Sequence, residues 1–252
     1  MAAQVIVVAN CKGGTGKTTT SVNLAAEFAQ QGRRTLLVDL DPQGHAGLGF
    51  GVSAEDEKAT AHHALRDPGA GVAASIRTSR VEGVDVLPAD PGFRVHSAAT
   101  DAFCLARALS AVEERYDQII IDTPPSADVP LIAALTSAHC VLVPTQLHHL
   151  AHHGLVKFSR LLFYVSSTLN SKLNAFAIVP IQIDMRMRLH QTILAQLLQD
   201  FGEERIFRGI RTDVSLAEAF GSNCPVRQYR PAARGADDYG LLARDVTTVW
   251  VH

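Results

Sequence analysis

Residues 5–20 read Val5-Ile-Val-Val-Ala-Asn-Cys-Lys-Gly-Gly-Thr-Gly-Lys-Thr-Thr-Thr20, a β-branched strand followed by a glycine-rich turn and the start of a helix. Gly13, Gly14 and Gly16 allow the backbone to curl so that several N–H groups point inward, and the helix adds its positive N-terminal end. A triphosphate fits such a cradle. The sequence therefore predicts a P-loop from Lys12 to Thr19, with nucleotide-binding residues Gly13, Gly14, Thr15, Gly16, Lys17, Thr18 and Thr19.

The residues after the glycines have the chemistry that a triphosphate and its metal require. The Lys17 ammonium can reach the β- and γ-phosphates as a point charge, and the Thr18 hydroxyl is placed to ligate Mg²⁺. Thr19 is expected to assist at the α-phosphate. An ordinary glycine turn would not explain a Lys-Thr pair directly after it. We therefore expect ATP and Mg²⁺ as cofactors and Mg²⁺-dependent ATP hydrolysis as the activity.

Acidic residues end two of the strands that the sequence predicts. The second strand runs into Asp39-Leu-Asp41-Pro42, and residues two apart on an extended chain point to the same face. Ligands gather beyond the carboxyl ends of parallel strands, so Asp39 and Asp41 could both face the phosphates. An Asp-Pro pair is also typical of a plain turn. A later apolar strand ends in Asp122, which has the form of a Walker B motif, and we expect Asp122 to hold Mg²⁺ together with Thr18.

Short runs rich in β-branched residues recur between amphipathic stretches. The predicted strands are residues 5–8, 35–38, 84–87, 118–121, 140–143 and 175–179. The predicted helices are residues 17–31, 97–115, 126–137, 151–169, 189–201 and 237–250. This alternation predicts an α/β fold, a doubly wound, mostly parallel sheet with helices on both faces. We expect residues 44–82 to form an irregular insertion with one short helix.

Length and composition fit one large α/β domain over residues 1–252, with 47% hydrophobic residues. A formal net charge of −2 argues against a protein that coats nucleic acid through bulk charge. The four cysteines are widely spaced and form no CxxC pair, so we expect reduced thiols. No apolar run approaches the roughly 18 residues that a membrane span needs. We expect a cytoplasmic protein that does not attach to a membrane.

A lysine before the glycines distinguishes this loop from an ordinary P-loop. Residues 12–18, Lys-Gly-Gly-Thr-Gly-Lys-Thr, resemble the deviant Walker A motif K-G-G-x-G-K-[ST] of the ParA/Soj/MinD group of ATPases, although Cys11 replaces a common glutamine. Residues 36–44, LLVDLDPQG, resemble the second motif of that group, and further likeness covers nearly the whole chain. The resemblance implies that Lys12 reaches across a dimer interface to the partner's phosphates. It also implies that Asp41 orients the attacking water while Asp39 acts nearer the metal. Lys12, Lys17 and Asp41 are then the catalytic residues, and Thr18, Asp39 and Asp122 are the metal residues.

The resemblance further implies an ATP-driven dimerisation switch. In that group, ATP sandwiched between two copies of the chain creates a form that binds DNA nonspecifically. A partner protein on the cargo stimulates hydrolysis, which releases the DNA. The cargo would be a plasmid or chromosome, or a protein assembly such as a chemoreceptor cluster or carboxysome. We accordingly expect a homodimer that associates with the nucleoid when ATP is bound.

Arginines dominate the basic residues of the second half of the chain, and their planar fork suits phosphate contact. The resemblance places adenine contacts in residues 210–215, at Arg211 and Asp213. The DNA-binding candidates are Arg186, Arg188, Arg230 and Arg234. Surface ion pairs with nearby acids are the alternative for these arginines.

Two other functions remain open at this point. A metabolic P-loop enzyme that uses ATP to activate a carboxylate, such as a cobyrinate diamide synthase or dethiobiotin synthetase relative, would share the loop. A MinD-like membrane-associated division regulator would need a lysine-rich amphipathic C-terminal helix, but residues 245–252 contain no lysine.

Histidines form two groups that invite a functional interpretation. At the start of a predicted helix they could ligate a metal, contact a partner or form a polar helix start; these are His148, His149, His152 and His153. His62 and His63 have no companion signal, and we expect both to be solvated.

Overall fold

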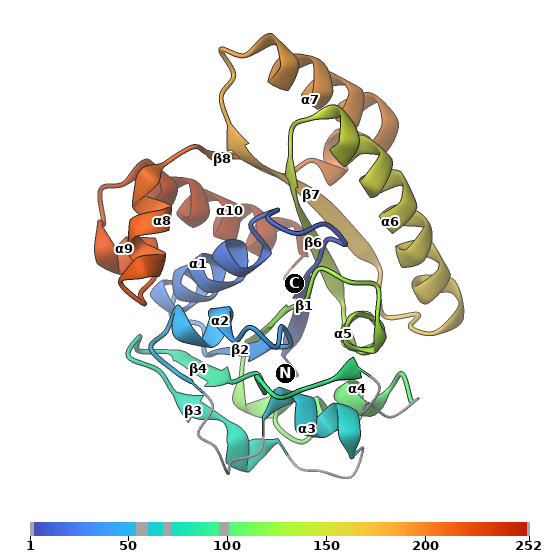
Figure 1. Ribbon diagram of the computed structural model, residues 1–252, viewed down its shortest axis with the longest axis vertical. Helices are drawn as coiled ribbons and strands as arrows, with labels where there is room; N and C mark the ends of the chain where they lie inside the picture. The colour runs from blue at the N-terminus through green and yellow to red at the C-terminus, as the bar shows by residue number, and fades with distance from the viewer. Residues whose placement is uncertain (1–2, 54–59, 68–71, 96–100, 251–252) are drawn as a thin grey trace.

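The computed structural model describes residues 3–53, 60–67, 72–95 and 101–250. In these ranges the strands form one sheet in the order β3-β4-β2-β5-β1-β6-β7-β8, and each neighbouring pair is parallel except β3 with β4. The strands are β1 (Gln4–Val8), β2 (Thr35–Asp39), β3 (Arg77–Thr78), β4 (Val84–Leu87), β5 (Gln118–Asp122), β6 (Cys140–Gln146), β7 (Ala175–Ile183) and β8 (Ile210–Arg211). The predicted α/β class with a doubly wound, mostly parallel sheet is confirmed (Figure 1).

Helices cover both faces of this sheet. The α-helices are α1 (Lys17–Gln30), α2 (His45–Leu48), α3 (Ala61–Arg66), α4 (Cys104–Ser110), α5 (Val129–Ser137), α6 (His149–Thr168), α7 (Arg188–Phe201), α8 (Val214–Gly221), α9 (Val226–Tyr229) and α10 (Arg234–Trp250). Single 3-10 turns are η1 (Ala73–Ser75), η3 (Glu113–Arg115) and η4 (Glu203–Arg205). Figure 1 shows α1 and α10 on one side of the sheet and α5 and α6 on the other.

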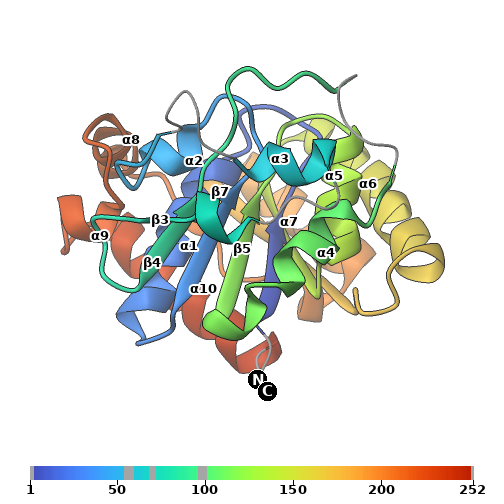
Figure 2. The same ribbon diagram turned by 90° about the horizontal axis from the view of Figure 1, so that it is seen from below.

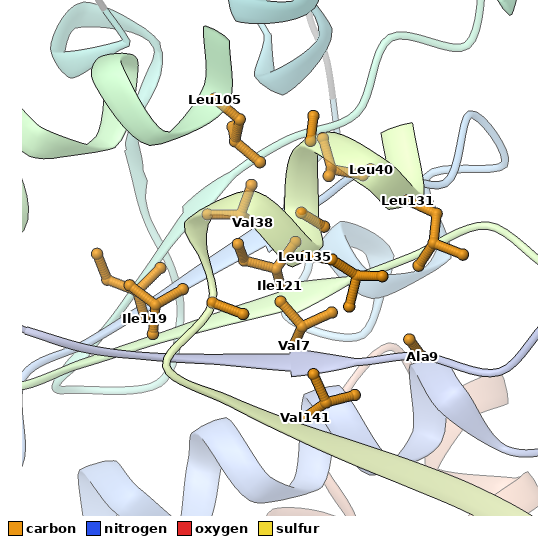
Figure 3. Packing of buried hydrophobic residues seen from close by; sticks show 14 of the residues in the cluster. Val7, Ala9, Val38, Leu40, Leu105, Ile119, Ile121, Leu131, Leu135 and Val141 are labelled. Carbon is orange, nitrogen blue, oxygen red and sulfur yellow. The ribbon is translucent and has the colours of Figure 1, made fainter. Parts of the chain in front are cut away.

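The two faces of the sheet bury separate hydrophobic clusters. Val7 packs into the cluster under α4, α5 and α6, whereas Ile6 and Val8 pack into the cluster under α1 and α10. Successive side chains of a strand point to opposite faces, so a strand buried on both sides must be apolar throughout. Figure 3 shows Leu135 of α5 beside Val7 and Ile121 of the neighbouring strand. The continuous apolar run of β1 is therefore the consequence of its central place in the sheet.

The register of the central strands brings two acids to the same edge of the sheet. Parallel pairing sets Val8 of β1 beside Asp122 of β5, and Asp39 of β2 beside the same Asp122. The glycine turn after β1 consequently lies above the carboxyl ends of β2 and β5. In open α/β sheets, ligands bind in the crevice outside these ends.

Both ends of the described chain lie near the amino end of β1, opposite the carboxyl ends of the strands where the two acids meet. The start of β1 lies beside the end of α10 (Figure 2), and Gln4 Nε2 donates a 2.6 Å hydrogen bond to the carbonyl oxygen of Trp250. The Trp250 ring packs on Phe207 with a centroid distance of 4.9 Å. The last helix is thereby anchored far from the glycine turn.

Residues 44–82 contain more structure than the one short helix predicted from the sequence. The described parts form α2, α3, η1 and β3. β3 is only two residues long and pairs antiparallel with β4, with Arg77 opposite Val86. Elements this short show no measurable periodicity, so a pattern search misses them. Residues 54–59 and 68–71 lie outside the described residues.

Elements after residue 96 also depart from the predicted boundaries. The helix predicted over 97–115 is reduced to α4 and η3, and its residues 97–100 lie outside the described part of the chain. The elements β8, α8 and α9 were not predicted, and β8 exists because Ile210 pairs with Ile181 of the long strand β7. This pairing supplies one wall of the cavity described below.

Candidate nucleotide site

The glycine turn adopts backbone conformations that require glycine. Gly14 and Gly16 have φ angles of 71° and 72°, in the left-handed region. A Cβ atom at Gly16 would lie 2.9 Å from Ile181 Cδ1, closer than carbon atoms approach. The Thr15 hydroxyl donates a 3.2 Å hydrogen bond to the Lys12 carbonyl oxygen and fixes the curl from inside. The turn is therefore a preformed cradle at the N-terminus of α1.

Lys17 is the cation inside this cradle. Its side chain is buried, and its Nζ donates a 3.2 Å hydrogen bond to the carbonyl oxygen of Lys12. Burial lowers the pKa of Lys17 below its usual value, while the negative charges of Asp122 and Asp41 oppose this shift. The three charges act on one another, so the structure brings together the lysine and two of the predicted acids.

Asp122 is held by two hydroxyl groups of α1. Thr18 Oγ1 donates to one carboxylate oxygen and Ser21 Oγ to the other, each at 2.8 Å. Burial raises the pKa of Asp122 to about 6, and the two hydroxyl groups and Lys17 only partly offset it. Hydroxyl and carboxylate oxygens are the ligands that Mg²⁺ prefers, and a buried carboxylate with incomplete compensation gains from a cation. The residues therefore fit a magnesium ion at Thr18 and Asp122.

Asp39 and Asp41 have different surroundings. Asp39 is fully buried, and its two oxygens accept N–H groups from Asp41 at 3.1 Å and Gly47 at 2.9 Å. Burial and the charge of Asp122 raise the pKa of Asp39 well above its usual value. Asp41 is half-buried, and its Oδ1 accepts the Gln43 N–H at 3.0 Å. Asp39 thus organises the turn that carries Asp41, and its predicted contact with the metal stays a prediction.

His62 is buried, so the prediction that it is solvated was wrong. Its Nδ1 accepts the Asp90 N–H at 2.9 Å and its Nε2 lies 3.1 Å from the Leu40 carbonyl oxygen, so Nε2 is the protonated donor. Burial lowers the pKa of His62 to about 4. The ring also lies 4.2 Å from that of Phe93. His62 therefore fixes the residue between Asp39 and Asp41, whereas His63 is exposed as expected.

A cavity of about 350 Å³ opens beside the glycine turn. Its lining residues include Gly16, Thr19, Ile181, Arg211, Asp213 and Tyr239. The Arg211 guanidinium makes a two-pronged contact with the buried Asp238, with Nη2 to Oδ1 at 2.7 Å. Asp213 caps α8 through the Ser215 N–H and also accepts the Gly235 N–H, both at 2.9 Å. Both predicted adenine residues therefore lie at the cavity, where their polar groups hold its walls together.

The second group of histidines is divided among separate contacts. His148 caps α6, accepting the Ala151 N–H at 3.1 Å, and its Nε2 lies 2.8 Å from Lys12 Nζ. His152 pairs with Asp200 of α7 at 2.5 Å. In the described ranges, no group of three or more His, Cys, Asp or Glu side chains is placed to hold a metal ion. The structure therefore gives no support to a histidine metal site.

The arginines predicted to bind DNA lie on two parts of the surface. Arg188 begins α7, and Arg186 lies just before it. Arg230 follows α9 and Arg234 begins α10, both away from α7 in Figure 1. Arg186 forms a two-pronged pair with Asp184, at 2.9 and 2.7 Å. Arg230 donates to Ser215 Oγ at 3.1 Å. Arg188 and Arg234 are exposed and have no hydrogen-bonded or ion-paired partner in the described part of the chain.

Asp122→Asn is expected to stabilise the metal-free protein at neutral pH. Because the pKa of Asp122 rises from 3.8 to about 6, the folded state binds more protons than the unfolded state between these values. With respect to Asp122, the free energy of unfolding is highest below the lower pKa and falls by about 1–3 kcal/mol as the pH rises through the upper pKa. The neutral amide avoids this loss. Thermal unfolding from about pH 5 to about pH 8 should show a gain for the variant that grows with pH. A variant less stable than wild type at the upper pH would contradict this account.

The fold, the glycine cradle and the acids at the strand ends define a P-loop ATPase. The chain matches a family model described as an AAA domain over residues 3–175. It is 37% identical to the sporulation initiation inhibitor protein Soj of Bacillus subtilis, covering 96% of this chain and 98% of that protein. It is 38% identical to the chromosome-partitioning ATPase Soj of Thermus thermophilus, covering 96% and 94%. The chain therefore belongs to the ParA/Soj family of ATPases.

A solved structure shares the architecture as well. Cobyrinic acid a,c-diamide synthase from Mycobacterium smegmatis, with bound ADP and magnesium, superposes with a TM-score of 0.82 at 29% identity, covering 98% of this chain and 95% of that one. No helix in the described ranges has the length and apolar character needed to cross a membrane.

Proposed function

We propose that residues 1–252 act as a single ParA-like unit, an ATP-dependent dimerisation switch that positions or segregates a cargo. One observation carries the proposal: the site contains two lysines in opposite environments. Lys17 is buried inside the cradle, whereas the Lys12 side chain is exposed on its rim. One chain thus has the cation that its own triphosphate needs and a second one available for another copy.

The relatives support the positioning function over the metabolic alternative. The two Soj proteins are more similar to this chain in sequence than the cobyrinic acid a,c-diamide synthase is, at 37% and 38% against 29% identity. One of these relatives is named a chromosome-partitioning ATPase. We infer a plasmid, chromosome or protein assembly as cargo, and a cargo-bound partner protein that stimulates hydrolysis.

The chemistry follows from the residues around the cradle. Backbone N–H groups of the glycine turn would bind the phosphates, and Lys17 would contact the β- and γ-oxygens. Thr18, Asp39 and Asp122 would hold Mg²⁺, which when bound neutralises charge on the phosphates. Asp41, on the turn fixed by Asp39, would orient the attacking water.

Pairing would also create the DNA-binding form. A single chain carries two separate arginine groups and a net charge of −2, so its own attraction to DNA is weak. A dimer would carry two copies of each group, and phosphate contacts add without reading sequence. The ATP-bound dimer would therefore associate with the nucleoid, and hydrolysis would release it.

Arg188→Ala and Arg234→Ala are expected to weaken ATP-dependent retention on random-sequence DNA. Both guanidinium groups are exposed and form no hydrogen bond or ion pair among the described residues, although Arg234 interacts electrostatically with the nearby Asp213, so they are available for phosphates. Each lost contact should reduce the slope of log affinity against log salt by about 1, equally on all sequences. Binding is measured with a nonhydrolysable ATP analogue over a salt series.

Arg208→Ala is the matched control, because Arg208 already pairs with Asp245 at 3.2 Å and should leave the slope unchanged. Wild-type binding that needs no nucleotide, or ATP turnover that depends on a small carboxylic acid and ignores DNA, would contradict the positioning function. The second result would favour the metabolic alternative.

A further inference from the structure

Lys12 rests on a histidine of its own chain. Its Nζ lies 2.8 Å from His148 Nε2, although the two residues are 136 positions apart. The Lys12 backbone is fixed, because its N–H donates to Asn10 Oδ1 at 3.1 Å and its carbonyl oxygen accepts Lys17 Nζ at 3.2 Å. The side chain is exposed beyond this anchor and can exchange one partner for another.

We propose that His148 is a positioning residue that seats Lys12 in cis and holds it back from a second copy of the chain. The inference rests on the proposed function, in which Lys12 crosses to the partner's phosphates. A side chain bonded to its own chain must leave before it crosses. We call this contact between Lys12 and His148 the seat. Its free energy is therefore subtracted from the free energy of pairing.

The two contacts of the His148 ring compete for one lone pair. A neutral imidazole accepts at one nitrogen only, and an ammonium can only donate. Lys12 is therefore held well when Nε2 accepts and Nδ1 carries the proton, and in that tautomer Nδ1 can no longer accept the Ala151 N–H. That N–H keeps a partner, because it also lies 3.0 Å from the His148 carbonyl oxygen. When Lys12 leaves, Nδ1 becomes the acceptor again and caps α6 fully.

The hydrogen bonding at the start of α6 thus depends on whether Lys12 contacts His148 or has crossed to the partner's phosphates. The seat and the full cap are alternative states of one ring, so pairing tightens the first turn of α6 while it empties the seat. This first turn contains the exposed His149 and Leu150, with Leu150 76% exposed. The coupling gives the histidine-rich helix start a role that requires no metal.

The seat depends on a neutral ring. Burial, the Lys12 ammonium and the neighbouring His149 together lower the pKa of His148 below its usual value, despite an opposing hydrogen bond from its own backbone. The neutral ring is therefore favoured at neutral pH. As the pH falls through this lowered value, the imidazolium loses its lone pair and repels the ammonium, which empties the seat.

His148→Asn tests the holding role directly. Asparagine is a good N-cap, so the helix start is retained, but its short amide takes away the imidazole that Lys12 contacts. The dissociation constant of the dimer formed with a nonhydrolysable ATP analogue should fall about 3- to 30-fold, since each dimer contains two seats. His153→Asn is the matched control and should leave it unchanged, because His153 is exposed one helical turn further along α6 and takes no part in the contacts of Lys12 and His148.

Histidine NMR titration of the nucleotide-free chain tests the contact without any pairing. The pKa of His148 should rise in Lys12→Ala, because the ammonium that opposes protonation is gone. A His148 pKa that does not move, or a His148→Asn dimer no tighter than wild type, would overturn the seat. If the wild-type chain itself fails to pair, both the proposed function and the holding role of His148 are contradicted. If the wild-type chain pairs and His148→Asn has the same dimer dissociation constant, only the holding role is contradicted.

Discussion

Asp41→Ala is expected to trap the chain in its ATP-bound, paired form. Asp41 contacts neither Thr18 nor Ser21, and the Asp122 carboxylate keeps both of its hydroxyl partners when Asp41 is truncated. Nucleotide binding and pairing should therefore persist. Hydrolysis should fall about 10²-fold or more, because the water loses the group that orients it. ATP turnover, and cosedimentation with random-sequence DNA in ATP, measure the two halves of this result.

Asp41→Asn separates the charge of Asp41 from its role in the turn. The amide oxygen can still accept the Gln43 N–H, which the aspartate accepts at 3.0 Å, so the turn is kept while the negative charge is removed. This variant should lose hydrolysis and accumulate on DNA like the alanine variant. If Asp41→Ala stays single and off DNA with saturating ATP, the positioning function fails.

The centre of the site could be predicted from the sequence because its determinants are local or follow from parallel register. The glycine turn is a continuous stretch, and Asp39 and Asp122 each end an apolar strand. Once both strands are parallel, their carboxyl ends meet, as the pairing of Asp39 with Asp122 confirms. No long-range information is needed for these residues.

Ser21 was missed although a signal for it existed. It lies one helical turn after Lys17, whose carbonyl oxygen its hydroxyl contacts at 3.0 Å, and it therefore faces the same acid as Thr18. Reading the polar residues of α1 by helical face would have found it.

Other contacts leave no local trace in the sequence. His62 holds the Leu40 carbonyl from 22 positions away, and Arg211 binds Asp238 from 27 positions away. Both depend on how α3 and α10 dock on the sheet. The charge pattern likewise did not distinguish paired from unpaired arginines, since Arg186 binds Asp184, as the ion-pair alternative anticipated. DNA contact by these arginines stays a prediction.

Lys12→Ala is expected to separate nucleotide binding from pairing. The chain's own cradle keeps Lys17, Thr18 and the inward N–H groups, and the Lys12 carbonyl that Lys17 contacts belongs to the backbone, which alanine preserves. ATP should therefore bind to a single chain. Each dimer would lose two ammonium–phosphate contacts of about 1.5–3 kcal/mol, so pairing should weaken about 10²- to 10⁴-fold. Light scattering with a nonhydrolysable analogue measures the pairing, and fluorescent-nucleotide titration measures the binding.

Two other lysines bracket this result. Lys157→Ala, on the exposed face of α6, should change neither binding nor pairing, whereas Lys17→Ala should abolish binding because it removes the buried cation of the cradle.

The removal of Lys12 also empties the seat on His148, which by itself would favour pairing. The measured loss of pairing free energy therefore equals the free energy of the Lys12 contact with the partner's phosphates minus the free energy of its contact with His148. A Lys12→Ala chain that pairs as well as wild type would mean that these two terms cancel or that neither exists. His148→Asn in a chain that keeps Lys12 distinguishes the cases, because it tightens pairing only where the seat exists. Adding His148→Asn to the Lys12→Ala chain tests whether the seat acts through Lys12. In the double variant no seat remains to be lost, so a seat that opposes pairing only through Lys12 predicts no further change.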